Sequence, residues 1–145
     1  MQKQVKLMNQ YVADLAVLNV KFHNLHWNVV GERFEPVHVY VEKLYDMIFE
    51  TYDEVAERIK MMGEFALASM KSYLDVTTVK EIENRDYQIP EVFEILLDEL
   101  TSLKELAIEI RELADDADDF ATVAMLEDQV AVYDKEIWFI KQSLK

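Results

Sequence analysis

The sequence predicts an all-α protein in which four long helices pack as a bundle, with one long crossover between the second and the third. The chain of 145 residues contains only two Gly and two Pro, whereas sheets joined by tight turns need more of both. It is 51% hydrophobic and 30% charged, as globular domains are. Its apolar residues recur at helical spacing in four segments. The length fits one domain, spanning residues 1–145.

The first helix is expected over about residues 3–28 and the second over about residues 36–63, because apolar side chains recur there every three or four positions. Gly31 lies between these segments, so the two helices are expected to be antiparallel neighbours. Gly63 is expected to end the second helix, since glycine commonly follows the last residue of a helix.

The third helix is expected to begin near Pro90, since proline suits the first position of a helix. The fourth is expected to begin near Asp119, whose side chain suits the N-cap position. Residues 64–89 can cross the bundle lengthwise, and within them Thr77–Asn84 is expected to form a short helix. Two short connections and one long crossover give the topology of a ferritin-like four-helix bundle.

Composition excludes several kinds of chemistry. The chain has no cysteine, which excludes disulfides, thiolate catalysis and cysteine-ligated metals. No stretch of about 18 uncharged apolar residues is present, so no membrane span is expected. No secretory signal is visible at the start, and a cytoplasmic location is therefore expected.

The net charge is −14, from 15 basic and 29 acidic residues. Residues 91–128 hold most of the excess, with 13 acidic against two basic residues, a net charge of −11. Such a surface repels nucleic-acid phosphates. It indicates either a solvated face or an affinity for cations.

Four polar residues of the second helix, His38, Glu42, Asp53 and Glu57, lie within an arc of about 100°. Histidine nitrogen and carboxylate oxygen are ligands for Fe(II), Mn(II) or Zn(II). However, His38 and Asp53 lie about 22 Å apart along one helix, so they cannot hold one metal ion within a single chain.

Twofold pairing of two chains removes this obstacle. If two copies of the second helix pack antiparallel about Met47 and Ile48, His38 of one chain meets Asp53 and Glu57 of the other. His26, at the end of the first helix, can join His38 across the turn. The alternative is an ordinary solvated helix face with structural histidines. The pattern Glu35-x-x-His38 is a weak match to the di-metal motif of bundle cores, because it lies at a helix start.

Residues 23–58 carry a resemblance to a known family. The run His23-x-x-His26-Trp27-x-Val29-x-Gly31-x-x-Phe34-x-x-x-His38, then Tyr45, then Asp53-Glu54-Val55-Ala56-Glu57-Arg58, resembles the Dps family of DNA-binding proteins from starved cells, or mini-ferritins. Weaker similarity lies in Ser72-Tyr73-Leu74 with Thr77–Asn84 and in Lys135-Glu136-Ile137-Trp138. The resemblance spans nearly the whole chain.

The resemblance implies a hollow homo-dodecamer that oxidises Fe(II), preferably with hydrogen peroxide over dioxygen, and stores the ferric mineral against oxidative stress. It implies ferroxidase sites at the twofold interfaces, each taking two iron ions, with zinc or manganese able to substitute. The implied metal ligands are His26, His38, Glu42, Asp53 and Glu57, of which Glu42 stands where the family often has aspartate.

Trp27 and His23 lie near these ligands in the sequence, and the resemblance implies different roles for them. Trp27 resembles the tryptophan beside the family's site, a candidate catalytic residue that quenches oxidising equivalents. The alternative is simple core packing. His23 is not a ligand position in the family and is expected to be structural.

The acidic segment between the third and fourth helices resembles the family's iron-entry pore. The candidate pore residues are Asp115, Asp116, Asp118 and Asp119. The alternative is a solvated loop that ends in an N-cap, and Ala124 stands where the family has an acidic residue.

Family members that coat DNA carry Lys/Arg-rich tails, but here only Lys3 and Lys6 precede or begin the first helix, and Lys141 and Lys145 end the chain. Direct DNA binding is therefore not expected. The competing readings are a nucleoid-associated DNA-protecting protein with little catalysis and an acidic helical scaffold. A full-size ferritin is disfavoured because its intra-chain ligands are absent.

Overall fold

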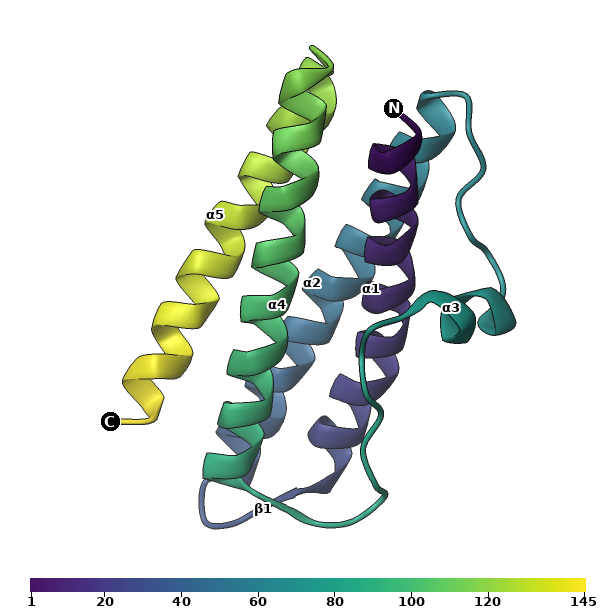
Figure 1. Ribbon diagram of the computed structural model, residues 1–145. Coiled ribbons are helices and arrows are strands. Elements are labelled where there is room, and N and C mark those ends of the chain that lie inside the picture. The colour runs from purple at the N-terminus through teal and green to yellow at the C-terminus, as the bar shows by residue number, and fades with distance from the viewer.

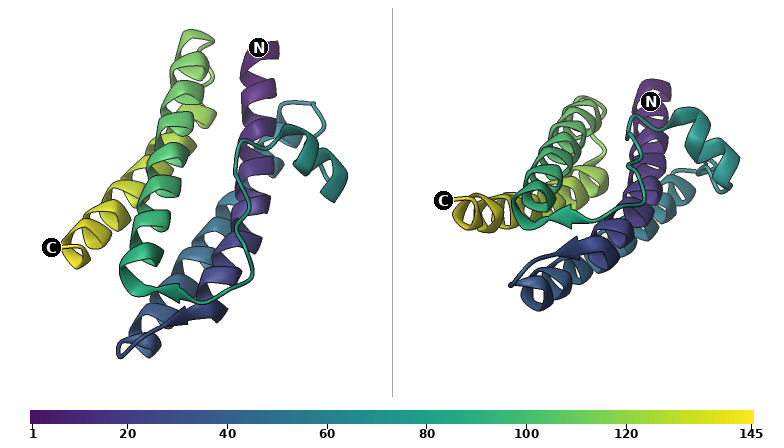
Figure 2. Two further views of the ribbon diagram at one scale, coloured as in Figure 1. Left: turned by 60° about the horizontal axis from the view of Figure 1, so that its bottom comes forward. Right: turned by 90° about the horizontal axis from the view of Figure 1, so that it is seen from below.

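The computed structural model describes residues 1–145. The long helices are α1 (Gln2–Asn28), α2 (Phe34–Met61), α4 (Ile89–Asp116) and α5 (Phe120–Ser143), with a short helix α3 (Met70–Val76) and two-residue strands β1 (Val29–Val30) and β2 (Tyr87–Gln88). Helices α1 and α2 form one antiparallel pair and α4 and α5 another, and α1 joins the pairs by packing on α4 (Figure 1). The crossover runs the length of the bundle, so α2 and α4 point the same way (Figures 1 and 2). The predicted all-α bundle is confirmed.

A single buried cluster fills the bundle and fixes which way each helix faces. In α2 the buried positions recur every three or four residues. Thr51 is one of them, and the apolar ones are Val37, Val41, Leu44, Ile48, Val55 and Ile59. Burying each such side chain stabilises the fold by about 1.5–3 kcal/mol. The polar stripe of α2 is therefore held on the outer face of the helix.

The predicted helix ends agree with the structure to within about two residues. Gly63 follows α2 with φ +87°, a left-handed conformation that favours glycine. Pro90 lies in the first turn of α4. The Asp119 side chain caps α5 by accepting a hydrogen bond from the backbone N–H of Thr122 at 3.3 Å.

The predicted helix at Thr77–Asn84 is wrong, because the short helix of the crossover is Met70–Val76. Ser69 caps that helix through a reciprocal capping box with Ser72. Beyond it, the buried carboxylate of Asp14 accepts hydrogen bonds from the Thr77 hydroxyl and from both the backbone N–H and the hydroxyl of Thr78, at 2.7–2.9 Å. The Thr77 hydroxyl oxygen also accepts from the backbone N–H of Val79 at 3.1 Å, but Asp14 binds both threonines to α1 and the chain continues without a helix.

The parallel pair β1–β2 was not expected. Val29 pairs with Tyr87 and Val30 with Gln88, which joins the end of the crossover to the turn between α1 and α2. Gly31 follows β1 with φ +134°, and a Cβ atom there would lie 3.3 Å from the Ile89 side chain. The turn therefore requires glycine for its backbone angle and for its contact with α4.

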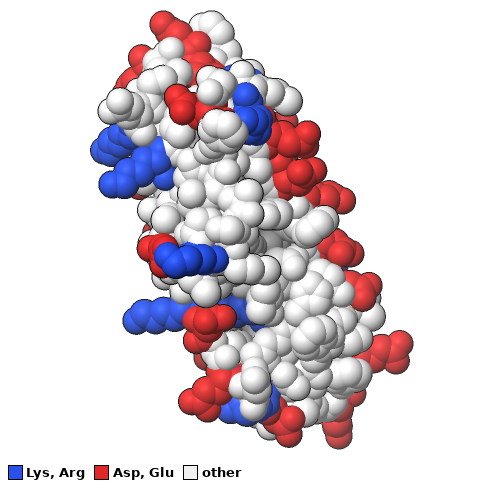
Figure 3. Space-filling model, turned by 90° about the vertical axis from the view of Figure 1, so that its right-hand side faces the viewer, with Lys and Arg blue, Asp and Glu red and all other residues white.

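Charged side chains are unevenly spread over the face that carries α3 and the crossover. Uncharged atoms run down its middle, acidic groups follow one edge, and most basic groups lie toward the other (Figure 3). None of the helices has the length and apolar character that crossing a bilayer requires.

Candidate metal centre

His26 at the end of α1 and His38 at the start of α2 lie face to face. Their rings stack with centroids 3.6 Å apart and planes 12° from parallel. Nδ1 of His26 donates to the backbone carbonyl of His38 at 2.6 Å, and Nδ1 of His38 donates to the carbonyl of His26 at 2.7 Å. A carbonyl can only accept, so both rings carry their proton on Nδ1.

In the neutral form of each ring, this arrangement leaves Nε2 with a free lone pair. A histidine ligand is commonly oriented by a hydrogen bond from its other ring nitrogen. His26 is only 5% exposed, whereas His38 is partly exposed. The Nε2 atoms of His26 and His38 are therefore suited to bind a divalent metal ion that approaches from the outer side of the α1–α2 pair.

Glu42 supplies a carboxylate at the same place. Its Oε1 lies 3.9 Å from Nε2 of His26 and 3.4 Å from the hydroxyl of Tyr45. A metal ion bonded to a nitrogen and an oxygen at about 2.1 Å holds these atoms about 3.0–3.4 Å apart. A small movement of the exposed Glu42 side chain would bring the pair to that separation.

His23, the third histidine, has a different environment. Its Nδ1 donates to the carbonyl of Asn19 at 2.6 Å, and its ring stacks on that of Tyr45 with centroids 3.7 Å apart. The Tyr45 ring also meets His26 edge-on, at 5.1 Å. The His23 and His26 rings also meet edge-on, with centroids 6.5 Å apart, so the three rings form one cluster.

Asp53 and Glu57 are exposed on α2, further along the helix than His38. Within one chain, no three His, Asp or Glu side chains, His26, His38 and Glu42 included, lie close enough together to hold a metal ion. Each chain therefore carries the histidine half and the carboxylate half of the predicted site at separate places on one surface.

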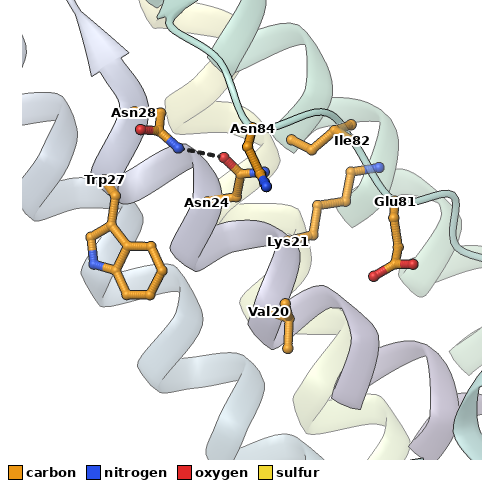
Figure 4. Close-up of a pocket in the computed structure, with 8 residues that line it drawn as sticks. All are labelled: Val20, Lys21, Asn24, Trp27, Asn28, Glu81, Ile82 and Asn84. Atoms are coloured by element: carbon orange, nitrogen blue, oxygen red, sulfur yellow. Dashed lines mark hydrogen bonds between the residues drawn. The ribbon is translucent and has the colours of Figure 1, made fainter. Parts of the chain in front are cut away.

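Trp27 is 67% exposed, so it does not pack in the core of the subunit, and that alternative is wrong. Its indole stands at one end of a cleft of about 320 Å³ between α1 and the crossover (Figure 4). Asn28 donates to Asn24 at 2.7 Å along the same wall of the cleft. The ring centroids of Trp27 and His23 are 5.5 Å apart.

The four candidate pore aspartates fall into two groups. Asp115, Asp116 and Asp118 are exposed, and Asp115 lies 3.5 Å from Arg111. Asp119 instead faces the subunit and accepts hydrogen bonds from Gln4 at 2.8 Å and Arg58 at 2.9 Å. The structure gives Asp119 a structural role, joining α1, α2 and α5.

Hydrogen bonds outweigh burial in setting the charge of Asp119. Burial alone would raise the pKa of this carboxyl. The hydrogen bonds from Thr122 and Gln4 and the positive charge of Arg58 lower the pKa below its usual value. Asp119 is therefore a stable anion at neutral pH.

Tyr45 is the residue of this region to which the sequence motif gave no role. Its desolvation and the negative charges of Glu42 and Asp46 raise the pKa of Tyr45, so its hydroxyl keeps its proton and donates. Its seven-residue spacing from His38 and three-residue spacing from Glu42 place all three on neighbouring turns of α2. That spacing was the available sequence signal.

The fold and the histidine pair together define a ferritin-like four-helix protein. The ferritin-like domain family matches residues 5–145 of this chain. The predicted resemblance to Dps is also confirmed. The DNA protection during starvation protein of Helicobacter pylori is 31% identical over 142 residues, covering 98% of this chain and 99% of the relative. Its Bacillus anthracis counterpart, DNA protection during starvation protein 2, is 34% identical over 145 residues, covering 99% of each chain.

Solved structures agree with these relatives. Dps from Staphylococcus aureus has a TM-score of 0.94 at 32% identity, covering all of this chain and 97% of that one. Dps from Listeria innocua, in a crystal soaked with zinc, has a TM-score of 0.93 at 32% identity, covering 97% of this chain and 95% of that one. The chain belongs to the Dps family of ferritin-like proteins.

Proposed function

We propose that this protein oxidises Fe(II) at sites shared between two subunits and stores the ferric product. One observation carries the proposal: His26 and His38 present two free Nε2 atoms, but no further carboxylate from the same chain besides Glu42 lies beside them. Asp53 and Glu57 of a second copy complete the ligand set when two α2 helices pack antiparallel.

The ligand types suit oxidation of iron that then moves on. Few ligands, most of them oxygen, bind Fe(II) weakly and leave positions open for an oxidant. Two Fe(II) ions give one electron each to hydrogen peroxide, which takes up two protons and leaves as two waters. Carboxylates from Glu42, Asp53 and Glu57 balance the charge gained as Fe(II) becomes Fe(III). Zinc or manganese fits the same donors, and dioxygen is the slower oxidant we expect.

Two further roles belong to this proposal. Exposed Trp27, at the same end of α1, gives up an indole electron and proton to oxidising species that escape the site. The exposed Asp115, Asp116 and Asp118 attract Fe(II) toward an entry pore of a hollow dodecamer, since a dense acidic surface steers cations. The Dps structures that this chain resembles support such an assembly.

Protection of DNA by this protein is proposed to be indirect. Relatives are named for DNA protection, but a net charge of −14 per chain repels phosphates strongly. Removing Fe(II) and peroxide protects DNA without contact. A nucleoid-coating role is the disfavoured alternative.

The test adds Fe(II) without oxygen and then hydrogen peroxide, and follows ferric absorbance alongside particle mass. We expect fast oxidation by an assembly near twelve times the 17.1 kDa chain. His38→Ala should lose most of the catalysed rate, whereas Glu35→Gln, one turn away and exposed, should keep it. A monomer without catalysed oxidation would overturn the proposal.

A further inference from the structure

Tyr45 lies at the centre of a set of contacts that the proposed ligands do not explain. Its ring stacks on that of His23 at 3.7 Å and lies nearly perpendicular to that of His26 at 5.1 Å, and these two histidine rings are themselves 6.5 Å apart. Its backbone carbonyl accepts from the Asn19 side chain at 3.2 Å. Its hydroxyl points to the carboxylate of Glu42, 3.4 Å away. Few rotations remain open to the ring, so the hydroxyl is fixed in place.

We propose that Tyr45, supported by His23, is a positioning residue that holds the Glu42 carboxylate beside Nε2 of His26. This inference rests on the proposed function, because it assigns Glu42 to the metal ion that His26 binds. It also gives His23 a role, since His23 fixes the ring that in turn fixes a ligand.

Glu42 needs such support more than the histidines do. Its side chain is 52% exposed and long, and ordering a glutamate side chain costs about 1.5–2 kcal/mol. The histidines are fixed by backbone carbonyls, but Glu42 contacts only the Tyr45 hydroxyl and, more loosely, His26. Without the hydroxyl, the carboxylate would spend most of its time in solvent.

The support for Tyr45 continues into α1. Nδ1 of His23 donates to the carbonyl of Asn19, and the Asn19 amide donates to the carbonyl of Tyr45. One turn of α1 therefore holds both the ring face and the backbone of Tyr45. A planar aromatic ring is what position 23 requires, rather than a metal-binding nitrogen.

Tyr52 offers a matched control on the same helix. It lies seven residues after Tyr45 and is also partly exposed, but its hydroxyl is hydrogen-bonded to that of Tyr73 on α3. Tyr52→Phe and Tyr45→Phe each remove one hydroxyl from α2, and only the second frees a carboxylate near His26.

The test measures anaerobic Co(II) binding to the assembled protein by calorimetry and by the visible spectrum of bound Co(II). Neither readout depends on iron oxidation. Hydrogen-bond partners of metal ligands commonly contribute 10–100-fold to affinity, so Tyr45→Phe should weaken Co(II) binding about tenfold. Glu42→Gln should weaken it at least as much, and the double variant no further than Glu42→Gln. Tyr52→Phe should bind as the wild type does.

His23 variants separate positioning from folding. His23→Phe keeps a stacking ring and should retain most of the affinity, whereas His23→Ala should match Tyr45→Phe. Wild-type affinity in Tyr45→Phe, with weak binding in Glu42→Gln, would overturn the inference and leave the metal site standing. Additive losses in the double variant would overturn it too. If His38→Ala also binds Co(II) normally, the proposed function fails instead.

Discussion

His26 and His38 each donate a hydrogen bond to the backbone carbonyl of the other, at 2.6 and 2.7 Å. The tautomer of both rings is thus set by the fold before any metal ion arrives. The carbonyl of His26 lies in the last turn of α1, where backbone acceptors lack further helical donors. The end of α1 therefore provides the acceptor that orients the His38 ring of α2.

Sites shared between chains should show complementation. His38→Ala and Asp53→Ala assemblies should each be inactive, because each lacks a ligand in every site. Random 1:1 mixing after dissociation should restore about a quarter of the wild-type rate, since one chain then provides an intact histidine half and its partner an intact carboxylate half. The measurement is peroxide-dependent Fe(II) oxidation after exchange is confirmed by mass. Mixed assemblies that stay inactive would contradict the shared site.

Gly31 should resist substitution more than Gly63 does. Gly31→Ala forces a side chain to φ +134° and places Cβ 3.3 Å from Ile89, which should destabilise the protein by about 1–3 kcal/mol. It should also weaken Co(II) binding, because the turn holds His26 and His38 together. Gly63→Ala meets open space and should affect stability only, by about 1 kcal/mol. Thermal unfolding at fixed protein concentration and calorimetry check both, and equal metal affinity in the two variants would contradict the prediction.

Much of the fold could be predicted because its signals are local. Apolar spacing, Gly63, Pro90 and Asp119 each act within a turn or two of helix. The path of the crossover could not be predicted in this way. It depends on a contact between Asp14 and Thr77, which lie 63 positions apart in the sequence. The β1–β2 pair is too short to have any periodicity and depends on a contact between Val29 and Tyr87.

Asp119 should stabilise the subunit in a pH-dependent way. Asp119→Ala removes the cap of α5 and the partner of Arg58, and should lower stability by about 1–2 kcal/mol at pH 7. The pKa of Asp119 is lower in the folded protein, so its stabilisation is complete above the unfolded pKa near 4 and is lost as pH falls through the folded pKa. The gap between wild type and variant in thermal unfolding should narrow in acid. The exposed Asp116→Ala should change little at either pH, and a gap that persists in acid would contradict the assignment.

Neutralising the acidic loop should slow iron entry. A triple change of Asp115, Asp116 and Asp118 to Asn should reduce the initial rate of Fe(II) uptake about tenfold at low salt, because electrostatic steering is lost. High salt should shrink the difference. A matched loss of three charges in the crossover, Glu81→Gln with Glu83→Gln and Asp86→Asn, should leave uptake unchanged. An equal effect from both triples would show that net charge, not the loop, governs entry.

The protein should not bind DNA directly. With −14 charges per chain, we expect no retardation of plasmid in a gel-shift assay at about 150 mM salt without divalent metal. Plasmid should nevertheless survive Fe(II) with peroxide when wild-type protein is present, and break when His38→Ala replaces it. Retarded plasmid would restore the nucleoid-associated alternative.

The site was predictable in its residue types more than in its geometry. Helical spacing places His38, Asp53 and Glu57 on one face of α2, and the length of α2 keeps His38 away from the two carboxylates within one chain. The hydrogen bonds from each histidine ring to the backbone carbonyl of the other cannot be predicted from the sequence, because every residue has a carbonyl. The sequence alone does not distinguish Tyr45 from other half-buried aromatic residues, because its contacts with His23, His26 and Glu42 depend on the fold.

The Asp14 contact is one of several through which α1 holds the crossover in place. By binding Thr77 and Thr78 near the middle of residues 64–89, it divides one long closure into two of about equal length. The entropy lost on closing a loop grows only slowly with its length, so dividing the loop changes the entropy cost of closure only a little. Asn9 binds the backbone of Phe65 and Leu67, Lys21 binds that of Lys80 and Asn24 binds that of Glu83. Side chains of α1 therefore hold the crossover along most of its path from α2 to α4.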